Sequence, residues 1–372
     1  MTEQEPNNNI SEFLNEWAPR KEVIATKENQ TQWKSCLLVV SSTSGFGKAA
    51  RLTPTVVQEL SKYYQRITVV PTTHDGHVRE IFGSEPNLSS YDVAVILGGD
   101  GAFAQALNGM MSRVDKQRVP LAHCPGGSVS AICGNTLGIW DYGEDDHHKL
   151  QKVCQHIGTR KLSKIDVNQI QCCDDTIRYS ALVLSGGNNA DIVRISDDYR
   201  WTYAWFGPTF RYVLGFFLAL YRYGARDNHR TLHVTIRYDN DSQEQAKLPV
   251  FGFSLYNCGR TTPDAAFNFT KLDSGSLGFV AVRNYLGFWK HLKFMKAVKK
   301  GDSNHDNLYS RNNIRSIKVE PTTDETIAKA TNSIRPCYLG FDGEMINGAG
   351  GNRLTVPFTA TVLPKEIEIV VA

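Results

Sequence analysis

Apolar runs alternate with amphipathic stretches along the first 140 or so residues of the chain. Four short runs, near 36–40, 66–72, 91–99 and 119–127, are largely apolar and predict buried strands. The stretches that follow them predict helices, one of them from about Lys48 to Tyr64. Strands that alternate with helices form parallel sheets. The pattern therefore predicts an α/β unit whose strand-end loops lie at one sheet edge.

The pattern changes after about residue 160, where strand-like segments follow one another with turns between them. This predicts a β-rich second domain with two helical interruptions, roughly Asp197 to Tyr223 and Tyr285 to Lys300. A late strand, EIEIVVA (366–372), can pair with either domain. We expect a polar lead-in over 1–33, an α/β lobe over 34–160 and a β-rich lobe over 161–372.

Composition narrows the class of protein. The 372 residues are 41% hydrophobic and 21% charged, as in a packed globular chain of two ordinary domains. A net charge of +3 is too small to indicate nucleic-acid binding, but it allows an anionic ligand or a membrane surface as partner. The acidic N-terminus does not resemble a secretory signal, and no apolar run reaches about 18 residues. The eight cysteines are scattered without metal-ligand spacing, so we expect a cytoplasmic protein with reduced thiols.

Three glycine-rich turns follow three of the predicted strands: SSTSGFGKA (41–49), GGDGA (98–102) and PGGSVSA (125–131). Glycine lets the backbone approach a ligand closely, and a helix start presents N–H groups that suit phosphate. Three such turns at one sheet edge predict a phosphate-binding crevice. The first turn is not a Walker motif, because Ser42 stands where that motif needs glycine, and its serines also exclude a dinucleotide fingerprint.

Two acidic positions are candidates for chemistry. Asp100 lies among the glycines of the second turn, where a carboxylate repels phosphate unless a cation such as Mg²⁺ intervenes. A helix N-cap is the alternative interpretation of Asp100. Far downstream, Asp342-Gly343-Glu344 offers a second carboxylate to accept a proton from a substrate hydroxyl, although an isolated DGE is usually a hairpin turn. Phosphoryl transfer needs positioning, charge neutralisation and such a base.

The motifs form an ordered set: SGFGKA (44–49), THDGHVRE (73–80), GGDG with ALNG (98–101, 106–109), PGGS (125–128) and DGE (342–344). With this set the chain resembles the diacylglycerol kinase catalytic family, which includes sphingosine kinases, ceramide kinases and bacterial lipid kinases. The resemblance spans about residues 35 to 370. GGDG alone is shared with NAD kinases and phosphofructokinase-like folds, whereas the late DGE is more specific.

The resemblance implies an NAD kinase/phosphofructokinase-like α/β nucleotide lobe followed by a β-sandwich lipid-binding lobe. It implies transfer of the ATP γ-phosphate to a primary lipid hydroxyl with Mg²⁺, on a transient membrane surface and without nucleic acid; the oligomeric state stays open. Asp100 and Asp342 match catalytic positions of the family, and Asp342 also matches a metal-binding one. The nucleotide-binding positions implied are Ser41, Thr43, Gly45, Gly47, His77, Gly99, Gly101, Ser128, Arg200, Arg211 and Glu344.

The lipid-binding positions implied are Asp191 and Val193. Sphingosine kinases use an aspartate at the place of Val193 for the lipid amine, so its loss favours a substrate without a free amine, as in ceramide kinases. Other departures lie in the phosphate turns: Ser41-Ser42 replaces the usual Asn-Pro, and Val129-Ser130 replaces the usual Gly-Asn.

Three hypotheses follow. The first is an ATP-dependent lipid kinase that acts on a sphingoid base, a ceramide or a diacylglycerol, bound peripherally to membranes. The second is an NAD kinase-like enzyme, which explains GGDG but not DGE, Arg200 or Arg211. The third, motivated by the altered turns, is a catalytically weak regulator that binds lipid or nucleotide with the same fold.

Overall fold

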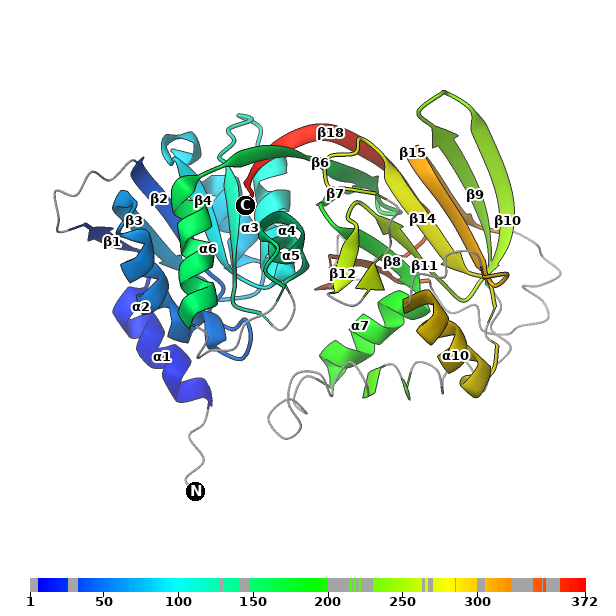
Figure 1. The fold of residues 1–372 in the computed structure, drawn as a ribbon, viewed down its shortest axis with the longest axis horizontal. Coiled ribbons are helices and arrows are strands. Elements are labelled where there is room, and N and C mark those ends of the chain that lie inside the picture. The colour runs from blue at the N-terminus through cyan, green and yellow to red at the C-terminus, as the bar shows by residue number, and fades with distance from the viewer. Residues whose placement is uncertain are drawn as a thin grey trace, which may run out of the picture. The chain divides into compact units, whose positions relative to one another are not determined.

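The computed structural model of the chain describes residues 6–25, 33–127, 130–140, 147–199, 214–215, 217–218, 221, 230–262, 265–266, 270–284, 286–299, 305–322, 337–342, 344–345 and 355–372. The chain divides into two compact units (Figure 1). Unit 1 comprises Met1–Ile165 and Lys365–Ala372, and unit 2 comprises Asp166–Pro364. The helix expected over 197–223 lies largely outside the described residues.

Unit 1 is built on a parallel sheet, as the alternating pattern predicts. Strands β2, β3, β4 and β5 pair in parallel in the order β3-β2-β4-β5. Parallel strands covered on both faces must be apolar throughout, and all six residues of β4 are buried. The strands are Trp33–Val40 (β2), Tyr64–Pro71 (β3), Val93–Gly98 (β4) and Leu121–Pro125 (β5).

The helices of unit 1 follow these strands in turn. Side chains on a strand alternate between its two faces, and Cys36, Leu38 and Val40 of β2 join one core cluster with α1, α2 and α6. Helix α4 packs on β4, and α3 packs against α4. The helices are Pro6–Trp17 (α1), Lys48–Leu60 (α2), His77–Ser84 (α3), Asp100–Met111 (α4), Ala131–Leu137 (α5) and His147–Thr159 (α6).

The N-terminal segment contains structure that the pattern analysis did not predict. Helix α1 buries Phe13 and Trp17 in the core of unit 1. Strand β1 (Lys21–Ile24) then pairs antiparallel with β3. The spacing of Ile10, Phe13, Leu14 and Trp17 is that of one helix face, so the signal was present in a segment that is polar overall.

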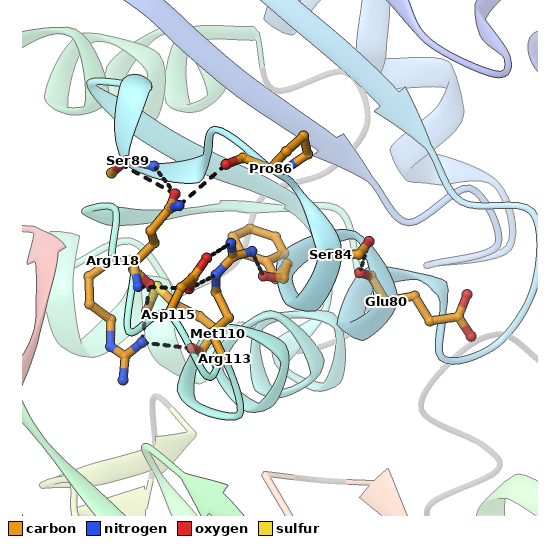
Figure 2. A network of polar contacts seen from close by, with 10 residues as sticks. Glu80, Ser84, Pro86, Ser89, Met110, Arg113, Asp115 and Arg118 are labelled. Carbon is orange, nitrogen blue, oxygen red and sulfur yellow. Dashed lines mark hydrogen bonds and ion pairs between the residues drawn. The ribbon is translucent and has the colours of Figure 1, made fainter.

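The C-terminal ends of α3 and α4 are joined by a polar network (Figure 2). Arg113 is buried, donates to both carboxylate oxygens of Asp115 at 2.8 and 2.6 Å, and donates to the carbonyl of Phe82 at 3.1 Å. Arg118 donates to the carbonyl of Met110 at 2.8 Å. Cations that bind the last carbonyls of a helix stabilise that end. The Arg113 hydrogen bond also lowers the pKa of Asp115 to about 2.

Unit 2 is β-rich and antiparallel, so the predicted order of an α/β unit followed by a β-rich unit is confirmed. Its ladders join β18 to β15, β15 to β14 and β9, β14 to β11, and β11 to β8. Its strands, with the two-stranded β12-β13 pair, are β6 (Leu162–Gln171), β7 (Ile177–Ser180), β8 (Val183–Gly187), β9 (Arg230–Tyr238), β10 (Gln243–Val250), β11 (Gly252–Tyr256), β12 (Arg260–Thr262), β13 (Ala265–Ala266), β14 (Leu277–Val282), β15 (Leu308–Pro321), β16 (Leu339–Phe341), β17 (Glu344–Met345) and β18 (Phe358–Val370).

Strand β18 contributes to both units. Its first part pairs with β15 in unit 2, from Phe358 opposite Val319 to Thr361 opposite Ser316. Near its end, Ile369 pairs with Leu121 of β5 in unit 1. The late apolar segment predicted as a separate strand is therefore the end of one long strand that starts before it.

Two described helices accompany the strands of unit 2. Helix α10 (Phe288–Lys299) lies within the range predicted from the sequence. Helix α7 (Asn188–Asp198) begins about nine residues before the helix that was predicted to start at Asp197. Gly187, with φ of +67°, ends the strand there, and Asn188 donates its N–H to the carbonyl of Phe251 at 3.0 Å. The predicted start of the helix was too late, because the polar positions directly after Gly187 form a helix N-terminus.

The packing of α3 on α4 gives a direct test. A Cβ added at Gly109 would lie 2.3 Å from the Arg79 carbonyl oxygen, whereas one at Gly83 would lie 3.8 Å from its nearest atom. We expect Gly109→Ala to lower the free energy of unfolding of unit 1 by about 1–3 kcal/mol. Gly83→Ala, in the same helix pair, is the control and should be neutral or stabilise by up to about 1 kcal/mol. Urea denaturation measures both; equal effects would contradict the close approach of the two helices.

Candidate functional site

The three glycine turns meet at one place in unit 1. A Cβ on Gly45 would lie 2.3 Å from the Gly126 carbonyl oxygen, which shows how closely the first and third turns approach. The Gly126 N–H donates to the Gly98 carbonyl at 2.7 Å, which joins the third turn to the second. A Cβ on Gly98 would lie 3.0 Å from Ser41 Cβ. The prediction that the turns share one sheet edge is therefore confirmed by direct contacts.

The first turn needs glycine for its backbone shape as well as for space. Gly45 has φ of +60° and Gly47 has φ of +81°, conformations that other residues adopt with strain. Ser44 Oγ donates to Ser41 Oγ at 2.7 Å, and Ser42 donates through N–H and Oγ to Thr72 at 3.0 and 2.8 Å. The serines that replace the family's usual Asn-Pro thus hold the turn through hydrogen bonds of their own.

Asp100 occupies the junction of the second and third turns. It is the first residue of α4, and its two carboxylate oxygens accept hydrogen bonds from the N–H groups of Ala131 at 2.8 Å and Ile132 at 3.1 Å. Those groups belong to the first turn of α5, so Asp100 caps the helix that follows the third glycine turn. The cap predicted as the alternative role is thus present, on a neighbouring helix rather than on α4. Its side chain remains partly exposed.

His123 lies directly behind the second turn and was not singled out from the sequence. It is 2% exposed on β5, and its Nε2 donates to the Gly98 carbonyl at 3.1 Å. Burial lowers the pKa of His123 to about 4, so the ring is neutral near pH 7. Phe103 of α4 packs edge-on against it, with ring centroids 5.9 Å apart. A histidine inside the otherwise apolar run LAHC was the signal available in the sequence.

His77 is the first residue of α3, directly after the turn that follows β3. Its Nδ1 accepts the Thr73 N–H at 3.1 Å, which stabilises the start of α3. His74 stacks on the His77 ring at 4.7 Å, and burial, with a smaller contribution from His74, lowers the pKa of His77. His74 in turn pairs with Glu80 at 3.1 Å. These contacts fix His77 at the start of α3, and its nucleotide-binding role stays a prediction.

The other predicted nucleotide-binding residues fall into two groups. Thr43 is exposed in the first turn, Gly99 is partly exposed, and Gly101 is buried in the first turn of α4. Ser128, Arg200 and Arg211 lie outside the described residues, and for Glu344 only the backbone, in β17, is described. Their assignments stay predictions.

Asp342 lies in a different environment, inside unit 2. It is 3% exposed and connects β16 to β17, which pair through Phe341 and Glu344. Its carboxylate accepts four hydrogen bonds, all from one segment: Ser180 Oγ at 2.7 Å and the N–H groups of Ala181, Leu182 and Val183 at 3.1, 3.0 and 2.8 Å. Burial raises the pKa of Asp342, and these hydrogen bonds oppose the rise. The arrangement favours an anchor for the chain over an exposed base or metal ligand.

The two predicted lipid-binding residues share the first half of α7. Asp191 is 6% exposed and accepts a hydrogen bond from Arg194 Nε at 3.1 Å. Val193 is partly exposed. Nearby, Asn189 Nδ2 donates to Ser254 Oγ at 3.1 Å, so α7 and β11 present hydroxyl and amide groups side by side. The sequence did not single out Asn189 or Ser254.

Of the two predicted catalytic carboxylates, one is placed to bind a magnesium ion together with phosphate. No group of three acidic, histidine or cysteine side chains placed to hold a metal occurs within the described part of the chain. Mg²⁺ in kinase sites usually binds through one or two carboxylates, phosphate oxygens and waters rather than a protein cage. Asp100 fits that mode because it is partly exposed among the glycine-rich turns that are predicted to bind phosphate. Asp342 does not fit it, because its carboxylate is enclosed.

Comparison with known proteins agrees with this geometry. Residues 35–170 match a family model described as the diacylglycerol kinase catalytic domain, which confirms the resemblance inferred from the motifs. The chain is 29% identical over 189 residues to sphingosine kinase 1 of Homo sapiens, covering 50% of this chain and 48% of that protein. It is 26% identical over 184 residues to ceramide kinase of Mus musculus, covering 45% and 33%. The matched regions thus span about half or less of these relatives.

The fold has a solved counterpart. A diacylglycerol kinase from Bacillus anthracis superposes with a TM-score of 0.57 at 16% identity, covering 91% of this chain and 97% of that one. At such an identity the likeness establishes the fold. Among the helices described, none has the length and apolar character needed to cross a membrane.

The carboxylate of Asp342 can be tested as an anchor. Asp342→Ala leaves four donors without an acceptor, three of them buried, so we expect the free energy of unfolding of unit 2 to fall by about 3 kcal/mol or more. Asp239→Ala, at an exposed position after β9, is the control and should change it by less than about 0.5 kcal/mol. Chemical denaturation measures both. An Asp342→Ala protein as stable as the control variant would contradict the anchoring role.

Burial of His123 predicts a pH effect. The folded state holds its pKa near 4 while the unfolded chain titrates near 6.5, so the unfolded state binds more protons between these values. We expect the wild type to lose up to roughly 3 kcal/mol of stability from this group as pH falls from 7 to 4. His123→Gln should remove that loss, and His148→Gln, at an exposed position, should not. Identical pH profiles for all three proteins would refute the assignment.

Proposed function

From the match of residues 35–170 to the diacylglycerol kinase catalytic family, we propose that the protein is an ATP-dependent lipid kinase. The observation that supports it most is the meeting of three glycine turns around Asp100. Turns of this kind present backbone N–H groups to phosphate, and phosphoryl transfer depends mainly on positioning and charge neutralisation.

In the proposed reaction the ATP phosphates lie along the first and third turns. Gly45 and Gly126 let the first and third turns pack closely against each other and against the start of α2, so both turns lie at the same end of the sheet. The hydroxyl oxygen of the lipid attacks the γ-phosphorus, the bond to the ADP oxygen breaks, and the hydroxyl proton passes to the Asp100 carboxylate. A magnesium ion held with Asp100 would neutralise phosphate charge.

The hydrogen bonds of Asp100 give it a fixed position for this role. Ala131 and Ile132 hold the carboxylate from one side, and His123 fixes the carbonyl of Gly98 two residues earlier. Because the cap binds Asp100 to the helix that follows the third turn, the base and the phosphate-binding loop move together. Phosphoryl transfer passes through a loose transition state, which an enzyme stabilises mainly by aligning the reacting groups and neutralising charge. A base that is fixed relative to the phosphate-binding loop provides this alignment.

For the acceptor we propose a lipid with a primary hydroxyl and no free amine, a ceramide or a diacylglycerol, in preference to a sphingoid base. Val193, on the same helix as Asp191, cannot form a charge-assisted hydrogen bond with an ammonium group. The chain has similar identity to sphingosine kinase 1 and to ceramide kinase, so identity does not distinguish between these lipid substrates. The preference therefore rests on the residues of α7.

A substrate panel tests the proposal. Purified protein is incubated with labelled ATP, Mg²⁺ and, separately, sphingosine, ceramide, diacylglycerol or NAD. We expect label in ceramide or diacylglycerol. Label in NAD alone would refute the lipid kinase and favour the NAD kinase-like alternative, and tight ATP binding without label would favour a regulator that has lost turnover.

With the labelled lipid in hand, Asp100→Asn tests the base. We expect kcat to fall by about 10²–10⁴-fold, because the amide accepts no proton, while the fold is retained because its oxygen still accepts a backbone hydrogen bond. Asp239→Asn, at an exposed position after β9 and outside the motifs, is the control and should keep kcat within a few-fold. Near-normal turnover in Asp100→Asn would rule out the role given to Asp100.

A further inference from the structure

Helix α10 of unit 2 has an unusual charge pattern. From Arg283 to Gly301 the sequence RNYLGFWKHLKFMKAVKKG contains six basic residues and no aspartate or glutamate. The whole chain has a net charge of only +3, so the net charge of this one segment exceeds that of the complete chain. Lys290, Lys293 and Lys296 follow one another at intervals of three, where like charges on a helix repel.

The inner face of α10 fixes the helix on unit 2. His291 and Phe294 are each 2% exposed. The His291 ring packs edge-on against Phe251 at 4.9 Å, and Phe294 packs against His305 at 4.8 Å. Burial lowers the pKa of His291 to about 4. The apolar contacts of α10 are thus used within unit 2, and the helix is held in a defined rotation.

That rotation places the cationic side chains outward together with a large aromatic one. Trp289 is 75% exposed, and Lys290, Lys293 and Lys296 are also exposed. Trp289, Lys293 and Lys296 have the spacing i, i+4, i+7, which puts them on one face of the helix. A face of lysines with one exposed tryptophan matches the two preferences of an anionic bilayer surface: cations at the headgroups and tryptophan at the interface.

We propose that the outer face of α10, formed by Trp289, Lys290, Lys293 and Lys296, docks the protein on an anionic membrane surface. The proposal rests on the proposed function for its purpose, because a lipid kinase must meet a substrate that resides in a bilayer. The binding itself is independent of turnover. The lysines bind anionic headgroups through charge, and Trp289 inserts at the interface, so the two contributions differ in their dependence on salt.

The test measures partitioning of the full chain onto vesicles of phosphatidylcholine with phosphatidylserine. Each lysine near such a surface contributes about fivefold to the partition coefficient. The triple variant Lys290→Gln, Lys293→Gln, Lys296→Gln should therefore bind at least about tenfold more weakly at low salt, with a smaller difference at high salt. Trp289→Ala should weaken binding several-fold at both salt concentrations. All four positions are exposed, so thermal unfolding should be unchanged.

A matched variant controls for net charge. Lys34→Gln, Lys152→Gln, Lys164→Gln removes the same number of charges from exposed positions on β2, α6 and β6 and should bind vesicles like the wild type. Equal loss in both triple variants would overturn the proposal, because binding would then follow net charge alone. Equal weakening of binding to a short DNA duplex and to vesicles would also overturn it, since the face would then be a general polyanion site.

The experiment separates this proposal from the kinase assignment. Phosphorylation of a short-chain, water-soluble lipid in solution does not require docking, so the α10 triple variant should keep wild-type turnover there. If the triple variant loses both its binding to vesicles and its turnover on vesicle-bound lipid, but keeps its turnover in solution, the proposal is supported. If the triple variant is active and binds vesicles as the wild type does, the docking proposal is refuted while the kinase proposal stands. If the wild type binds vesicles selectively but phosphorylates no lipid, the kinase proposal is refuted while the docking proposal stands.

Discussion

The close approach of three backbone turns is the constraint on which the candidate site depends. Gly45 faces the carbonyl oxygen of Gly126 with no room for a Cβ, and Gly126 is hydrogen-bonded to Gly98. Each turn follows a strand of the same parallel sheet, so the buried strands fix where the turns begin. The glycines then decide how near the turns come to one another. A side chain at any of these positions would separate the loops and move Asp100 with them.

Around this contact, polar groups with structural roles hold the functional ones. His123 supports the carbonyl of Gly98 from inside the sheet, and Asp100 caps α5 through its carboxylate. The same side chain that is proposed to receive a proton thus also joins two loops. This double role explains why a carboxylate can lie among phosphate-type turns without disrupting them. Its charge is partly balanced by the N–H groups at the start of a helix.

The two acidic motifs of the sequence have different physical settings. Asp100 is partly exposed and accepts hydrogen bonds from a helix start, whereas Asp342 is enclosed and accepts four hydrogen bonds from residues 180–183. The first residue of the DGE motif therefore has a structural role in unit 2, where it holds residues 180–183. The lysines of α10 differ from both, because they remain exposed while the other face of the helix is packed.

Periodicity and the glycines at strand ends were enough to predict the parallel sheet of unit 1, the β-rich character of unit 2 and the resemblance of residues 35–170 to the diacylglycerol kinase catalytic domain. The sequence pattern did not predict α1, because its apolar face lies in a segment that is polar overall. It also placed the start of α7 too late, because Gly187 and a backbone hydrogen bond end the preceding strand. The groups that each carboxylate contacts follow from the folded chain and not from the local sequence. The partners of Asp100 and Asp342 lie 31 and about 160 residues away along the chain, and no local pattern encodes such contacts.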